Sequence, residues 1–127
     1  MASSDKQLDN GNRVVTSFST ILELLDQLRA STRAKQGQEN QLLLWRCAAE
    51  AEYLAFLMAT LHDLNDFTPD INVGMNPSAD GAYDLVKKAK DLAESNPRLA
   101  YGYVRQAVFV LRSLEAGVRR AEKLRGQ

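Results

Sequence analysis

The stretch PRLAYGYVRQAVFVLRSLEAGVRRAEKLR, residues 97–125, constrains the architecture most, because its apolar residues repeat at one constant helical spacing. Steps of four and three residues alternate over three heptads, which favours a long helix packed against near-antiparallel neighbours. Asn96 is suited to cap this helix, and Pro97 to occupy its first position, where no hydrogen bond is lost. The residues of this repeat, called the apolar seam below, are Ala100, Val104, Ala107, Leu111, Leu114, Val118 and Ala121.

Three segments upstream also have helical patterns, at residues 13–35, 39–66 and 79–94. Asn12 is expected to cap the first of them and Gly37 to end it. Residues 1–12 are polar and predict a flexible tail, so a single domain is expected over residues 13–127. Residues 67–78 contain two prolines and a glycine, which predict one long loop. We therefore predict an all-α fold, an up-down antiparallel four-helix bundle with one long loop between helices two and three.

The composition is typical of a single globular domain. The chain has 127 residues, of which 45% are hydrophobic and 25% charged, and this excludes a disordered chain. Sixteen basic residues balance sixteen acidic ones, so no uniform basic field draws the whole molecule to nucleic acid or to a membrane. The polar N-terminus has no signal-peptide pattern, and the apolar run at residues 53–61 is too short to span a bilayer. We expect a cytoplasmic protein without a membrane partner.

The sequence contains no recognisable catalytic, cofactor or metal site. Cys47 is the single cysteine and His62 the single histidine, and their separation along one helix is too large for a nucleophile–base pair. One histidine also cannot supply the paired Glu-x-x-His motifs of a metal-binding bundle. We therefore expect a buried Cys47 and a protein that is not an enzyme.

Residues 53–61 are apolar on nearly every side of the predicted second helix. A helix that is apolar all round is buried all round. Either this helix is central in the fold, or its outer face meets another subunit. Trp45, Tyr53, Phe56 and Tyr83 are also candidates for lining a small-ligand pocket inside the bundle.

Charge is distributed unevenly along the chain. Residues 37–66 hold one basic and five acidic residues, whereas residues 97–127 hold seven basic and two acidic residues. Four arginines of the last helix lie seven residues apart, in one row beside the apolar seam: Arg98, Arg105, Arg112 and Arg119.

This basic row has three interpretations. It faces carboxylates of a neighbouring helix such as Glu50, Glu52 or Asp63, or an acidic helix of another subunit, or the phosphates of a nucleic acid. The neutral chain has no nucleic-acid-binding signature, which argues against the third interpretation.

The last helix carries more apolar residues than its seam requires. Phe109 lies nearly opposite the seam, where an exposed aromatic side chain would anchor an interface. We predict that this side of the helix contacts a second copy, as a homodimer, or a helical partner protein, through Tyr101, Gly102, Tyr103, Val108, Phe109 and Val110.

The sequence thus favours a non-catalytic helical interaction and assembly module that self-associates through its last helix. Two alternatives stay open. One is an accessory nucleic-acid-binding protein that uses the arginine row, and the other is a helical bundle that binds a small ligand.

Overall fold

The computed structural model describes residues 2–34 and 37–125, with side chains described for residues 9–31 and 41–124. These residues form four helices and no strand. The predicted all-α class and the helical bundle are confirmed. The helices are α1 (Ala2–Ala34), α2 (Gly37–Leu61), α3 (Ala79–Leu92) and α4 (Pro97–Arg125).

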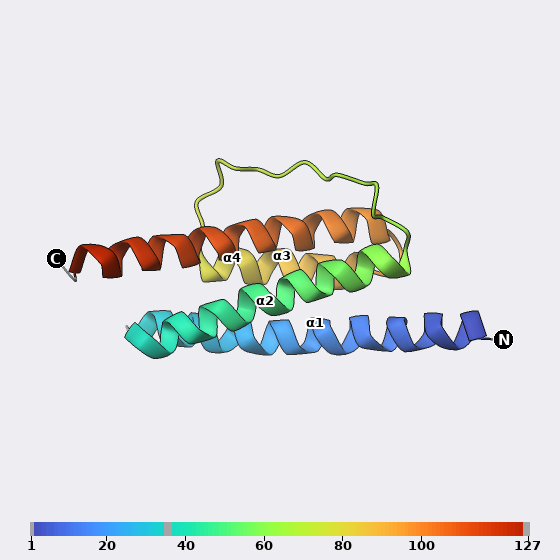
Figure 1. The fold of residues 1–127 in the computed structure, drawn as a ribbon, viewed down its shortest axis with the longest axis horizontal. Coiled ribbons are helices and arrows are strands. Elements are labelled where there is room, and N and C mark those ends of the chain that lie inside the picture. The colour runs from blue at the N-terminus through green and yellow to red at the C-terminus, as the bar shows by residue number, and fades with distance from the viewer. Residues whose placement is uncertain (1, 35–36, 126–127) are drawn as a thin grey trace.

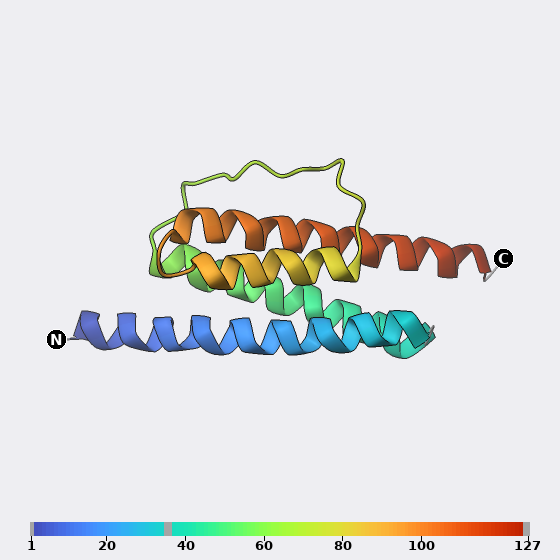
Figure 2. The same ribbon diagram turned by 180° about the vertical axis from the view of Figure 1, so that it is seen from behind.

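The helices form a closed ring of contacts in which α1 and α4 lie on one diagonal and α2 and α3 on the other. Each contacting pair is antiparallel (Figures 1 and 2). Residues 62–78, the crossing loop, run back along the bundle beside α4 to the start of α3, so that α2 and α3 point in the same direction. The predicted alternation of direction therefore holds between α1 and α2 and between α3 and α4, but not from α2 to α3.

The first helix begins before its predicted start. Residues 2–12, predicted as a tail, are helical, so Asn12 lies inside α1 and does not cap it. Asp9 and Arg13, one turn apart across the predicted boundary, form an ion pair at 3.1 Å. Such pairs support an exposed helical segment even where Gly11 lowers its propensity. Gly37, expected to end the first helix, is the first residue of α2, and the predicted end at Lys35 lies outside the described residues.

The second helix ends at Leu61, before the predicted end at Asp66. Asp63 has a left-handed backbone with a φ of 54°, and the Leu64 N–H donates to the Ala59 carbonyl at 2.8 Å. This is a Schellman-type helix end, which satisfies a carbonyl that the last turn leaves free. Aspartate is one of the few residues other than glycine that adopts this conformation.

Side-chain caps define the starts of α3 and α4. The Ser78 hydroxyl accepts a hydrogen bond from the Gly81 N–H at 2.9 Å. A Cβ on Gly81 would lie 2.9 Å from that same oxygen, so glycine leaves room for the cap. The Asn96 side chain accepts from the Leu99 N–H at 3.2 Å, which confirms the predicted cap of α4.

The α4 seam is buried over its first half only. Beyond Leu111, Val118 is half-buried and Ala121 is exposed. The reason is that the C-terminal part of α4 extends beyond Ala79, where α3 begins (Figure 1). The buried seam residues are Ala100, Val104, Ala107 and Leu111.

One glutamine side chain fastens the crossing loop to α4. Gln106 Oε1 accepts from the Asn72 N–H at 2.7 Å, and Gln106 Nε2 donates to the Asn72 carbonyl at 2.9 Å. Pro69 is buried, and its Cβ lies 3.7 Å from the place that a Cβ on Gly102 would occupy. The loop therefore runs along the bundle against α4 (Figure 2).

Replacing Gln106 with Ala is expected to release the crossing loop, because both hydrogen bonds to Asn72 are lost. The free energy of unfolding should fall by about 1–3 kcal/mol. Urea denaturation measures this loss, and hydrogen exchange at the Asn72 amide measures the release. Ser113→Ala, at a half-buried position of α4, is the control. Unchanged exchange at Asn72 in the Gln106→Ala chain would contradict the role assigned to Gln106.

Candidate interaction surfaces

The crossing loop and the core bury or partly cover the α4 residues that were predicted to form an interface. Tyr101 and Val110 are buried in the chain's own core, so this part of the predicted interface is corrected. Tyr103 and Val108 are half-buried and pack against that core. Gly102 and Phe109 are also half-buried, and Pro69 approaches Gly102 from the loop. An interface role for the four half-buried residues stays a prediction.

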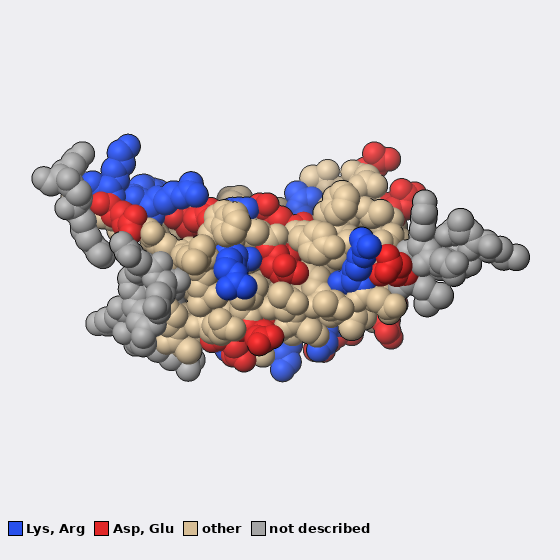
Figure 3. All heavy atoms as spheres, turned by 60° about the horizontal axis from the view of Figure 1, so that its bottom comes forward, with Lys and Arg blue, Asp and Glu red and all other residues tan. Residues whose placement is uncertain are grey.

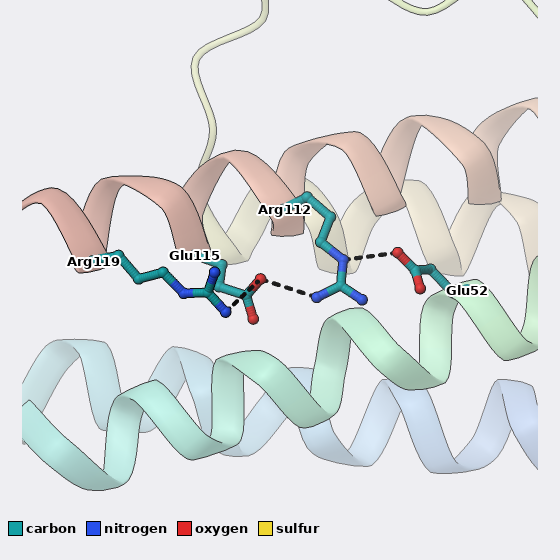
Figure 4. Close-up of polar contacts among 4 residues, drawn as sticks. All are labelled: Glu52, Arg112, Glu115 and Arg119. Carbon is teal, nitrogen blue, oxygen red and sulfur yellow. Dashed lines mark hydrogen bonds and ion pairs between the residues drawn. The ribbon is translucent and has the colours of Figure 1, made fainter.

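Part of the arginine row is neutralised inside the molecule. Arg112 Nε donates to Glu52 Oε1 at 2.7 Å, and Arg112 Nη1 donates to Glu115 Oε1 at 2.9 Å. Arg119 lies 3.8 Å from the same Glu115 oxygen, so four side chains from α2 and α4 form one chain of ion pairs (Figure 4). The predicted contact with a carboxylate of a neighbouring helix is confirmed for Glu52. Glu50 instead accepts a hydrogen bond from Ser17 of α1 at 2.8 Å.

The other two arginines of the row have aromatic partners. Arg105 Nη1 donates to the Tyr101 hydroxyl at 2.7 Å. The Arg98 guanidinium lies 4.6 Å from the centre of the Phe67 ring. Within the described part of the chain, Arg98 makes no ion pair with a carboxylate. The four arginines therefore have different surroundings and do not form one uniform row of free cations.

The outer face of α2 is apolar and uncovered. It consists of Leu42, Trp45, Ala49, Tyr53, Phe56 and Thr60, which follow one another at helical spacing. Leu42 and Phe56 are 63% and 64% exposed, and Trp45 and Tyr53 are 51% and 44% exposed. The opposite side of the helix, which includes Cys47, Leu54 and Met58, is fully buried. The α2 outer face therefore points directly away from the core.

This face is large for a surface in contact with water. The exposed fractions of its four large side chains amount to about 400 Å² of apolar surface. The largest apolar patch on a typical monomer is of this size and is often functional. Figure 3, which turns the lower side of Figure 1 toward the reader, shows uncharged surface along the molecule with charged side chains scattered through it.

The predicted aromatic pocket does not form. Trp45, Tyr53 and Phe56 point outward from α2. Tyr83 belongs to α3, which lies diagonally across the bundle from α2. The Tyr83 ring stacks instead on the Arg29 guanidinium of α1, at 3.7 Å.

A different cavity lies under the crossing loop. This loop pocket has a volume of about 560 Å³ and is bounded by residues 67–75, the first turns of α4 and Leu85 of α3. Arg98 and Gln106 are among its polar residues. Its apolar lining includes Phe67, Met75, Leu85, Leu99 and Tyr103.

Burial shifts the pKa of two titratable groups, Cys47 and His62. Cys47 is fully buried, and burial raises the pKa of its thiol to about 12. Burial also lowers the pKa of His62. Within the residues that the structure describes, no three His, Cys, Asp or Glu side chains are grouped so as to hold a metal ion. Over those same residues, no helix combines the length and apolarity needed to cross a membrane.

Comparisons with family models, with curated proteins and with solved structures find no match to this chain.

The ion pair between Glu52 and Arg112 gives a pH-dependent prediction. The hydrogen bond from Arg112 lowers the pKa of Glu52 below its ordinary value, so the pair stabilises the fold above that value and is lost as the pH falls through the lowered pKa. Because Glu52 is half exposed, Glu52→Gln should lower the free energy of unfolding by only about 0.5 kcal/mol at pH 7.

The difference between Glu52→Gln and the native chain should be smaller at pH 3 than at pH 7, because protonation of Glu52 at its lowered pKa removes the charge that Arg112 binds. Urea denaturation at the two pH values measures it. Glu23→Gln, at an exposed position of α1, is the control. A difference that persists unchanged at low pH would contradict the electrostatic origin.

Proposed function

We propose that this chain is a non-catalytic intracellular module of four helices that self-associates through the α2 outer face. The observation that carries the proposal is the exposure of Leu42, Trp45, Tyr53 and Phe56 on one side of a helix whose other side is fully buried. A helix that is apolar all round needs a second covering layer, and α1 and α4 cover only the inner side of α2. The proposed surface is thus on α2, not on the last helix where the sequence placed it.

The size of the face fits a reversible dimer. Standard interfaces bury about 800 Å² on each partner, and the α2 outer face supplies about half of that. Neighbouring polar residues supply a rim: Asp9 and Thr16 of α1 lie beside Tyr53, and Arg119 of α4 lies beside Trp45. We therefore expect association that depends on protein concentration.

The α2 outer face is self-complementary about Ala49. Leu42 and Phe56 are each seven residues from Ala49, and Trp45 and Tyr53 are each four residues from it. Two antiparallel α2 helices that cross at Ala49 on a two-fold axis therefore place Leu42 opposite Phe56 and Trp45 opposite Tyr53. The small side chain of Ala49 allows close approach at the crossing point, with the helix axes about 8–10 Å apart.

Phe56→Glu should shift the protein from dimer to monomer, because it places a charge within an apolar contact. Light scattering after size-exclusion chromatography, over a range of protein concentrations, measures the mass. Val73→Glu is the control, since Val73 is also a largely exposed apolar residue but lies in the crossing loop. Little change is expected between 50 and 200 mM salt, whereas binding to an added DNA duplex would weaken steeply. A mass that is the same for Phe56→Glu and the native chain would overturn the proposal.

Ala49→Cys should form a disulfide-linked dimer under mild oxidation, because the two-fold axis places the two new thiols side by side. Thr60→Cys, on the same face, is the control: eleven residues from the axis, its two copies would lie about 33 Å apart. The native Cys47 is buried with a raised pKa and stays unreactive. Non-reducing electrophoresis measures the cross-link. Equal cross-linking of the two variants, in a protein that is dimeric by mass, would reject the register but not the self-association.

A further inference from the structure

The walls of the loop pocket are held by contacts between the crossing loop and α4. Its outer wall, residues 67–75, is held by the paired hydrogen bonds between Gln106 and the Asn72 backbone. Its inner wall is α4, where Gly102 has no side chain to occupy the space beneath Pro69. A volume of about 560 Å³ lies within the range of small-molecule sites.

The surface inside the pocket is mainly apolar. Phe67, Met75 and Leu85 contribute to its walls, and Leu99 is 45% exposed at the first turn of α4. Gln106 is buried, and both ends of its amide are engaged by Asn72. The pocket interior therefore favours a hydrocarbon or aromatic group over a strongly polar one.

The electrostatics of the mouth favour a negative charge. Arg98 lines the pocket, stacks on Phe67 at 4.6 Å and makes no ion pair within the described chain. The Lys88 ammonium lies 5.9 Å from the centre of the Tyr103 ring, and Tyr103 lines the pocket. The first turn of α4 contains no acidic residue, so the positive end of the helix dipole adds to the Arg98 charge. Asp70 is the opposing acidic residue of the lining.

We propose that the loop pocket binds a small amphiphilic carboxylate, with its hydrocarbon part against Phe67, Met75 and Leu85 and its carboxylate at Arg98. A planar guanidinium pairs with a carboxylate through two parallel hydrogen bonds, while its flat face stays stacked on the Phe67 ring. This site is separate from the α2 outer face and does not depend on self-association.

Decanoate, decan-1-ol and decylammonium are suitable probes, because they share one hydrocarbon chain and differ only in the head group. Isothermal titration below the micelle concentration should give saturable binding for decanoate, weaker binding for decanol and none for decylammonium. Decanoate should also raise the melting temperature of the native chain. Equal affinity for decanoate and decylammonium would overturn the assignment.

Arg98→Gln should weaken decanoate binding about fivefold to tenfold, to the level of decanol, and leave decanol binding unchanged. Arg120→Gln, at an exposed position near the other end of α4, is the matched control and should leave both affinities unchanged. An unaltered decanoate affinity in Arg98→Gln would reject the role of Arg98.

Gly102→Leu should abolish binding of both decanoate and decanol, because the new side chain fills the pocket beneath Pro69. Chemical-shift mapping on the native chain keeps the proposal testable if this variant does not fold. Decanoate should shift the amides of Asn72, Leu99 and Gly102. Shifts confined to Tyr53 and Phe56 would place the probe on the α2 outer face and overturn the proposed site.

Discussion

The attachment of the crossing loop to α4 by Gln106 is the contact on which the rest of the molecule depends. The paired hydrogen bonds to the Asn72 backbone hold residues 62–78 along the bundle and not free in solvent. Because the loop runs back along the bundle before α3 begins, α3 runs in the direction of α2. The same loop covers the outer side of α4 and forms the wall of the loop pocket.

The two helices with excess apolar residues, α2 and α4, therefore differ in how much of that excess is exposed. On α4, the loop and the core bury Tyr101 and Val110 and partly cover Tyr103. On α2, no described segment lies over the side opposite the core, and Trp45 and Phe56 stay exposed. Composition alone does not distinguish these cases, since exposure depends on which helix the loop happens to cover.

The sequence predicted those parts of the fold that depend on local signals. The heptad spacing and the Asn96-Pro97 start located α4. The end of α2 was missed because its signal is an aspartate with a left-handed backbone, not a glycine or proline. The helical state of residues 2–12 was missed because glycine and asparagine there suggest a tail when the ion pair at Asp9 is not considered. Which arginines meet carboxylates, and the pocket beneath the loop, depend on tertiary placement that residue spacing does not contain.

The direction of the chain in the bundle also separates its two ends. Because α1 and α4 are parallel, α1 begins at one end of the rod and α4 finishes at the other (Figure 1). A helix of 29 residues, such as α4, is about 44 Å long. Groups tethered at the start of α1 and at the finish of α4 would therefore be held apart by a stiff spacer of that length, an arrangement that an alternating bundle, with both ends on the same side, does not provide.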